Sequence, residues 1–155
     1  MNIYEKLQEQ ACKEGIDIVD YNFQSDRIKG LYCDGMVAIS NKIDTSVEKA
    51  CVLAEEIGHY HTAVGDITDQ SDVENRKQEL KGRLWAYNQQ IGLIGLVRAF
   101  EHGCQNRFEI AEYLEVTEEF LEECIECYRN KYGICKRVDN YVVYFTPYLA
   151  IIKII

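Results

Sequence analysis

The chain has 155 residues, about the length of one domain, and its 17 Lys and Arg against 26 Asp and Glu give a formal charge of −9. This excess of acid argues against direct nucleic-acid binding and against an anionic membrane surface as partner, because both require clustered cations. The hydrophobic content of 47% and charged content of 28% are ordinary for a folded globular domain and argue against disorder.

The cysteines and the apolar segments indicate the compartment. The seven cysteines are an odd number spread along the chain, which argues against a disulfide scaffold. The first residues contain no basic segment followed by an apolar stretch, so no signal peptide is predicted. The apolar run over residues 141–152 contains Pro147 and is too short to span a bilayer as a helix. We therefore expect a cytoplasmic protein with no membrane partner.

Periodicity and turn residues predict the elements of the N-terminal part. They are a helix over 2–14, a strand over 16–19, a strand pair over 29–33 and 36–40, and a helix over 45–61. Asp34-Gly35 between the paired strands is a strong signal for a two-residue hairpin turn. Thr45 or Ser46 can cap the second helix, which runs to about His61.

The C-terminal part is predicted to be mostly helical. A loop over 65–71 is followed by helices over 72–90, 91–101, 108–114 and 118–132. Gly92 marks a possible break before the second of these helices, and Thr117 and Gly133 begin and end the last. The β-branched and aromatic segments 141–145 and 148–155 are predicted strands or extended packing segments. The predicted fold class is α+β, with helix in the majority.

The predicted helix that ends near His61 contains the pattern Glu-Glu-x-x-His, formed by Glu55, Glu56 and His59. Glu55 and His59 are four residues apart, about 40° around a helix axis, so both side chains can reach one divalent metal ion. Glu56 lies one position further round and can reach a water on that ion. The geometry is that of the zinc-protease motif His-Glu-x-x-His, in which the glutamate is the general base. The pattern alone is also typical of a solvated acidic helix turn.

A third acidic residue strengthens the metal hypothesis. Glu79 lies on the next predicted helix, and two helices joined by a loop of this length can pack antiparallel. A carboxylate on the second helix can then complete a metal site begun on the first. The packing surface of the second helix is supplied by Leu80, Leu84, Trp85 and Tyr87.

The segment around His59 is one of several that follow one another in a fixed order. They are Gly30-Leu31-Tyr32, Leu53-Ala54-Glu55-Glu56-Ile57-Gly58-His59, Thr62, Gly65-Asp66-Ile67, the Glu79 helix with its small-residue position and Trp85-Ala86, Ala111-Glu112-Tyr113-Leu114, Val116-Thr117-Glu118-Glu119-Phe120 and Tyr132-Gly133. Together they resemble the ImmA/IrrE family of metallopeptidases, most of all members carried by phages and integrative elements of Gram-positive bacteria. The resemblance covers most of the chain, and the ordered set is more specific than the five-residue pattern.

The resemblance implies a zincin-like core, with a site helix, a small antiparallel sheet and a second helix that gives the third ligand. It implies His59 and Glu79 as metal ligands and Glu56 as general base. It also implies a partner, a phage-type repressor with a helix-turn-helix domain, whose cleavage lets the mobile element be induced. We expect a single zincin-like domain over 1–155, with the metal-site core in 1–90 and the remaining helical and extended part packed on it.

Glu55 stands where the fuller family motif has histidine. A carboxylate oxygen is an acceptable zinc ligand, so Glu55, His59 and Glu79 are the predicted ligands. Two carboxylates and one imidazole bring a divalent ion to net zero charge, which acidifies a water less and favours a weaker hydrolase. An oxygen-rich site also suits manganese or iron besides zinc. His61 and Asp66 are alternative ligands at the helix end and in the loop after it.

Two other patterns have structural interpretations. The segment 108–120 resembles a helix-turn-helix, but residues 108–128 contain eight glutamates and no Lys or Arg, which would repel phosphates. We expect a helical pair that packs on the core or meets a partner protein. Cys124 and Cys127 lie within a predicted helix, without a second Cys-x-x-Cys, and are predicted to act as small hydrophobes.

The sequence leaves three functional hypotheses. The first is a metal-dependent endopeptidase that acts on a repressor. The second is a non-catalytic zincin-like protein that binds and antagonises the repressor; Glu55 keeps this alternative open, whereas Glu56 favours the enzyme. The third is a helical adaptor without metal, which requires that Glu55, His59 and Glu79 do not converge. The oligomeric state is left open.

Overall fold

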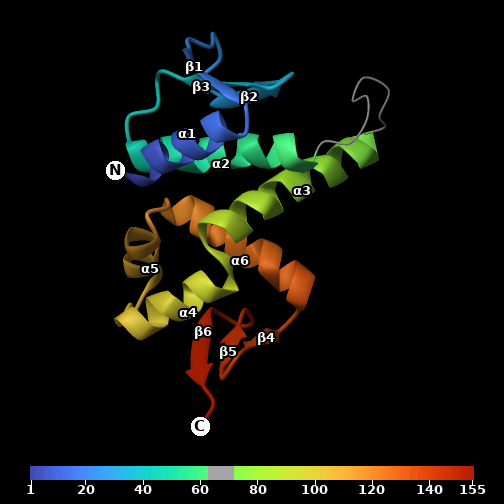
Figure 1. Ribbon diagram of the computed structural model, residues 1–155. Helices are drawn as coiled ribbons and strands as arrows, with labels where there is room; N and C mark the ends of the chain where they lie inside the picture. Colours follow the sequence, from blue (N-terminus) through green and yellow to red (C-terminus); the bar gives the residue numbers. More distant parts are fainter. Residues whose placement is uncertain (63–71) are drawn as a thin grey trace. The chain divides into compact units, whose positions relative to one another are not determined.

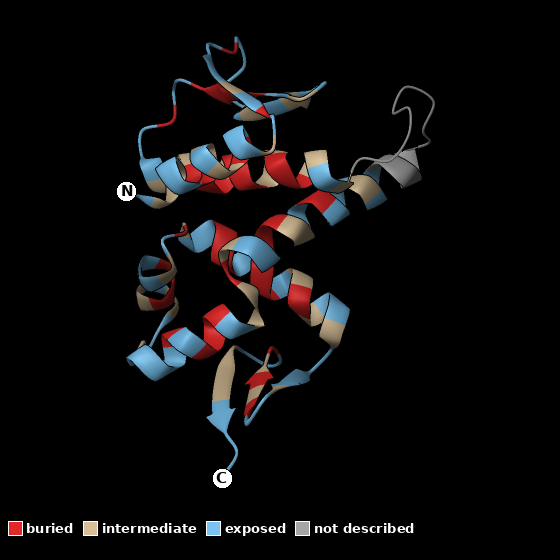
Figure 2. Ribbon diagram, viewed as in Figure 1, coloured by how far each residue is buried: buried red, intermediate tan, exposed pale blue. Residues whose placement is uncertain are grey.

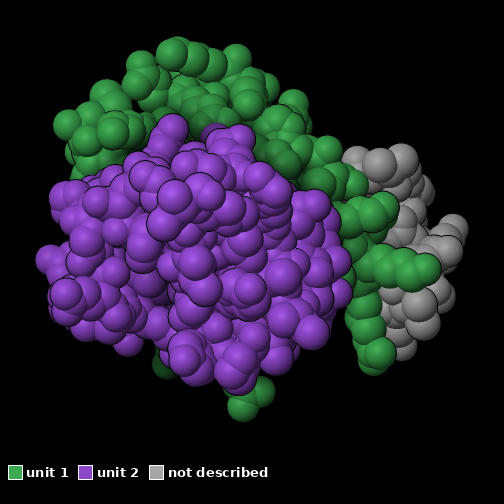
Figure 3. Space-filling view, turned by 90° about the horizontal axis from the view of Figure 1, so that it is seen from below, with its two compact units in different colours: residues 1–86 green, residues 87–155 purple. Residues whose placement is uncertain are grey.

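Figure 1 shows the computed structural model of the chain, which describes the backbone of residues 1–62 and 72–155 and the side chains of residues 1–62 and 76–155. The predicted loop over 65–71, including Asp66, lies outside the described residues. The chain divides into two compact units, Met1–Ala86 and Tyr87–Ile155, coloured separately in Figure 3. This division falls close to the expected subdivision at residue 90, and the expectation of a single domain stays a prediction.

The first unit combines helices with a three-stranded sheet. Its elements are α1 (Ile3–Lys13), β1 (Asp17–Tyr21), β2 (Gly30–Cys33), β3 (Met36–Ser40), α2 (Ser46–Thr62) and most of α3 (Asp72–Gln90). The strand order is β1-β3-β2, with β2 antiparallel and β1 parallel to β3. The parallel pair departs from the antiparallel sheet that was expected. It arises because the β2–β3 hairpin returns β3 between the other two strands, alongside β1.

Local signals explain the hairpin and the start of α2. Asp34 and Gly35 have φ values of 46° and 78°, the left-handed conformations that a tight two-residue hairpin turn requires. The predicted turn is therefore confirmed. The hydroxyl Oγ1 of Thr45 accepts a hydrogen bond from the backbone N–H of Glu48 at 3.1 Å, which identifies Thr45 rather than Ser46 as the capping residue of α2.

α2 is amphipathic and contacts α1, β2 and β3 (Figures 1 and 2). Its buried residues are Ala50, Cys51, Leu53, Ala54, Ile57 and Gly58. Val37 and Ile39 of β3, the central strand that α2 contacts, are completely buried as well. Glu55, Glu56 and His59 belong to the half-buried part of the same helix. The core thus fixes α2 and leaves the polar motif at the boundary with solvent.

The second unit contains the end of α3, three further helices and a second sheet. The elements are α4 (Gly92–His102), α5 (Arg107–Leu114), α6 (Glu118–Tyr132), β4 (Cys135–Val138), β5 (Tyr141–Tyr144) and β6 (Ala150–Lys153). The strand order β4-β5-β6 is antiparallel throughout. The sequence did not predict β4. The missed signal is Asp139-Asn140, a pair of turn residues that joins β4 to β5 with Val138 opposite Tyr141.

The acidic helical pair α5 and α6 packs into the core of the second unit, in line with the structural interpretation of this segment. Its apolar residues Ile110, Val116, Phe120 and Leu121 are buried, whereas most of its glutamates are exposed. Cys124 is completely buried on α6 and behaves as a small hydrophobe, as predicted. Across the described part of the chain, no helix combines the length and apolar character needed to cross a membrane. The architecture is α+β and zincin-like.

Candidate functional site

The contact between α2 and α3 in the first unit brings two of the predicted site residues together. The Nε2 atom of His59 lies 3.3 Å from Oε2 of Glu79. Two ligand atoms on one tetrahedral zinc, with bonds of about 2.0–2.1 Å, are about 3.3 Å apart. The nitrogen and the oxygen therefore have the spacing of neighbouring ligands of one metal ion.

No third ligand joins His59 and Glu79 among the residues whose side chains are described. Within residues whose side chains are described, no group of three His, Cys, Asp or Glu has the arrangement needed to hold a metal ion. Glu55 lies one turn before His59 on α2, and its charge acts on the neighbouring Glu56. Its role as a ligand stays a prediction. The donors that fit a metal here are the imidazole of His59 and the carboxylate of Glu79.

The two helices approach closely because both have glycine at the contact. A Cβ atom built on Gly58 of α2 would overlap the backbone carbonyl oxygen of Gly82 in α3 and lie 3.0 Å from its carbonyl carbon. No side chain larger than hydrogen fits at Gly58. The sequence placed Gly58 in the family segment but gave no sign of this contact, since it depends on which part of α3 faces α2.

Glu56 is positioned by the edge strand β2. A Cβ atom on Gly30 would lie 2.7 Å from Cγ1 of Val52, and 3.1 Å from Cγ and 3.3 Å from Oε1 of Glu56, so the absent side chain leaves room for Val52 and for this carboxylate. Burial raises the pKa of Glu56 to about 7, and the negative charges of Glu55 and Glu79 add to the effect. A carboxylate whose pKa lies near neutrality is well suited to accept and return a proton at physiological pH.

Glu79 has a second partner that the sequence did not reveal. Its other oxygen, Oε1, lies 3.3 Å from Nε of Arg83, one turn further along α3. The carboxylate is therefore oriented between a guanidinium on one side and the imidazole of His59 on the other. An i,i+4 Glu–Arg pair is common on helices, so the spacing alone did not distinguish Arg83 from an ordinary surface residue.

His61 has well-defined contacts with α1 and α3. Its Nε2 atom lies 2.8 Å from Oε2 of Glu14, and its ring stacks on Trp85 with centroids 4.8 Å apart and an interplanar angle of 21°. These contacts connect the ends of α1 and α2 to α3. They support a structural role for His61, which the sequence had offered as an alternative ligand.

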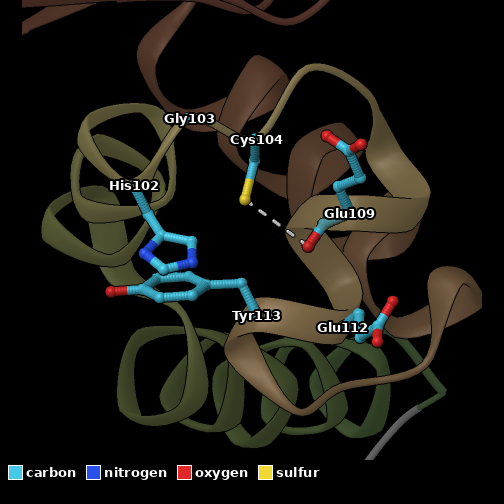
Figure 4. A pocket seen from close by; sticks show the side chains of 6 residues that line it. All are labelled: His102, Gly103, Cys104, Glu109, Glu112 and Tyr113. Atoms are coloured by element: carbon cyan, nitrogen blue, oxygen red, sulfur yellow. Dashed lines mark hydrogen bonds between the residues drawn. The ribbon is translucent and has the colours of Figure 1, made fainter.

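A second cluster of site-type residues lines a hollow of the second unit, between the end of α4 and α5 (Figure 4). The ring of His102 stacks on Tyr113, with centroids 4.5 Å apart, and the Cys104 thiol donates to the backbone carbonyl of Glu109 at 3.5 Å. Desolvation, followed by the charge of Glu109, raises the pKa of the Cys104 thiol. Since the thiolate is the reactive form, this cluster does not have the character of a nucleophilic centre.

Comparison with known proteins agrees with the geometry of the first unit. Residues 11–126 match the family model of the IrrE N-terminal-like domain, a peptidase family. No curated protein and no solved structure shows significant similarity to the chain. The matched range includes all of α2 and α3, and with them Glu56, His59 and Glu79. Because the match extends over well more than half of the sequence, the chain belongs to the IrrE N-terminal-like family, which implies a function of the metallopeptidase type.

Proposed function

We propose that the protein is a metal-dependent endopeptidase that cleaves a transcriptional repressor of the phage type. The observation that carries the proposal is the contact of His59 Nε2 with Glu79 Oε2 at 3.3 Å, on the same helix pair that holds the partly buried Glu56. Family membership supports a divalent metal as cofactor. The donor pair and the general base thus occur together in the unit where the family motif lies.

Glu55, His59 and Glu79 are the proposed ligands, and zinc is the first candidate for the metal. Three carboxylates, those of Glu55, Glu56 and Glu79, act on one another here, and their mutual repulsion contributes to the raised pKa of Glu56. A divalent cation would offset that repulsion. Imidazole and carboxylate together are common zinc ligands, and the high share of oxygen also suits manganese or iron.

In the proposed reaction, a bound divalent ion supplies Lewis acidity toward an amide carbonyl and a water molecule. Glu56 takes one proton from the water while the water oxygen forms a bond to the carbonyl carbon. The protonated Glu56 then passes that proton to the amide nitrogen as the carbon–nitrogen bond breaks. Burial beside Gly30 keeps the carboxylate of Glu56 in place and poorly solvated, which makes it a better proton acceptor.

The substrate class rests on the family resemblance and on charge. A helix-turn-helix repressor presents a basic surface for DNA, and the present chain has a formal charge of −9. Opposite net charges accelerate the encounter of two proteins and favour their correct orientation. The acidic composition therefore supports a basic protein, rather than nucleic acid, as the partner.

Metal content provides the first test. We expect about one divalent ion per chain in wild type purified without added metal or a polyhistidine tag, and loss of that ion in His59→Ala, measured by elemental analysis. His102→Ala is the matched control, because its ring belongs to the second unit and stacks on Tyr113, and it should retain the metal. Absence of metal in wild type, even after titration with zinc and manganese, would contradict the proposal and favour a protein that antagonises the repressor by binding alone.

A further inference from the structure

The imidazole of His59 occupies a gap on α3 that exists only because residue 82 is glycine. A Cβ atom built on Gly82 would overlap Nδ1 of His59 and lie 2.7 Å from its Cε1 and 3.2 Å from its Cγ. These three nearest atoms all belong to the same ring. We refer to this gap, bounded by Gly82 and filled by the ring of His59, as the Gly82 notch.

In this arrangement Nε2 is the ring nitrogen of His59 that faces Glu79. With the Nδ1 edge of the ring against α3 at Gly82, the opposite nitrogen, Nε2, lies 3.3 Å from Oε2 of Glu79. Gly82 and Glu79 are three residues apart on α3 and therefore lie on the same face of the helix. Arg83 holds the other oxygen of that carboxylate at 3.3 Å. One turn of α3 thus orients both the imidazole and the carboxylate.

Glycine at position 82 lowers the stability of the helix relative to alanine, so its presence there needs an explanation. It lies within the long helix α3, where alanine would favour the helical conformation more strongly. The φ of Gly82 is not positive, so the backbone conformation does not require glycine there. What excludes a side chain is the ring of His59.

We propose that Gly82 is a positioning residue, whose missing side chain holds the imidazole of His59 with Nε2 directed at Glu79. The consequence for metal binding rests on the proposed function, whereas the fit of ring and notch does not. A metal ligand that is held in place before the ion arrives loses less conformational freedom on binding. Replacing such a positioning group typically lowers metal affinity or activity about 10–100-fold.

A double-mutant cycle on the metal-free protein tests the notch directly. Gly82→Ala is expected to lower the thermal unfolding midpoint in wild type, because the new methyl group displaces the ring. In the His59→Ala background the obstacle is gone, so the same substitution should leave the midpoint unchanged or raise it. An equal loss in both backgrounds would overturn the proposal. If Gly82→Ala alone does not fold, recovery of folding in the double variant supports the notch, and failure in both contradicts it.

Two other glycines serve as controls for this cycle. Gly58→Ala should lower the midpoint with or without His59, because its methyl group meets the backbone of Gly82 rather than the ring. Gly95→Ala in α4 should leave the midpoint unchanged or raise it, since its Cβ would lie at an ordinary 3.4 Å from Cδ2 of Leu114 and alanine favours a helix over glycine. These controls separate a specific clash with the ring from a general effect of alanine in a helix.

Cobalt(II) titration tests the consequence for ligand geometry. We expect Gly82→Ala to weaken cobalt and zinc binding about 10–100-fold and to change the visible absorption of bound cobalt, with Gly95→Ala unchanged. Unaltered affinity and spectrum in Gly82→Ala would overturn the positioning role. A wild-type chain that binds neither ion would instead overturn the proposed function, and the cycle above would then decide on the notch independently.

Discussion

Glu56→Gln is expected to lower the rate of peptide hydrolysis about 10²–10⁴-fold while leaving the bound metal in place. Glutamine has nearly the same size and fits the same space beside Gly30, but its amide does not accept a proton from water at neutral pH. The measurement is kcat/KM for cleavage of purified helix-turn-helix repressors of the source genome, with casein as an unstructured substrate. Mass spectrometry identifies the products, and elemental analysis reports the metal.

Glu9→Gln is the matched control for this loss of activity. Glu9 is an exposed carboxylate on α1 that pairs with Lys13, so the substitution removes one charge far from the motif in sequence and should retain full activity. Undiminished cleavage by Glu56→Gln would contradict the assignment of the general base. Inactivation of the repressor without cleavage, equally strong in Glu56→Gln and wild type, would instead identify stoichiometric binding as the function.

The same substitution is expected to stabilise the metal-free protein at high pH. The pKa of Glu56 rises from an ordinary value of 4.5 to about 7 on folding, mainly because of burial and then because of Glu55 and Glu79. Between these two values the folded state binds more protons than the unfolded state, so the unfolding free energy falls as pH rises. This loss of unfolding free energy, caused by the ionised Glu56 in the folded state, is complete above pH 7 and disappears as pH falls toward 4.5. Glu56→Gln removes it.

The expected gain is on the order of 3 kcal/mol at pH 8, because a tenfold change in proton affinity corresponds to about 1.4 kcal/mol. It should shrink to less than about 1 kcal/mol at pH 5. Urea unfolding of wild type and Glu56→Gln at both pH values, with chelator present, measures the difference. Glu9→Gln should show no comparable dependence on pH. Equal stability of Glu56→Gln and wild type at pH 8 would show that the carboxylate is not held in a poorly solvated position.

Local signals in the sequence predicted much of the secondary structure. The bounds of α3 match the predicted helix over 72–90, and Asp34-Gly35 forms the expected turn. Such features depend on neighbouring residues only. The parallel pairing of β1 with β3 was missed because it depends on the path of the chain through the β2–β3 hairpin, which no local pattern encodes. β4 was missed because Asp139-Asn140 is a weaker turn signal than a pair ending in glycine.

In the candidate site, too, the features that depend on sequence spacing were predicted, and those that depend on contacts between elements were not. The spacing along one helix related Glu55, Glu56 and His59 to one another, and the antiparallel packing that the following loop allows suggested Glu79 on the next helix. The roles of Gly30 and Gly82 depend on which side chain of α2 faces them, so they became evident only in three dimensions. The pKa of Glu56 likewise results from burial and from charges on two helices.

The glycines of this chain differ in what would be tolerated in their place over evolutionary time. Gly35 and Gly103 have φ values of 78° and 99°, so a substitution there is strained by the backbone although no atom stands in the way, and asparagine tolerates this conformation better than most residues. At Gly58 a side chain would meet the backbone of Gly82, which no change of residue type removes, whereas at Gly82 it would meet the ring of His59. Relatives that vary at position 82 should therefore vary at position 59 as well. Lineages in which both positions have changed would be those in which the histidine is no longer present.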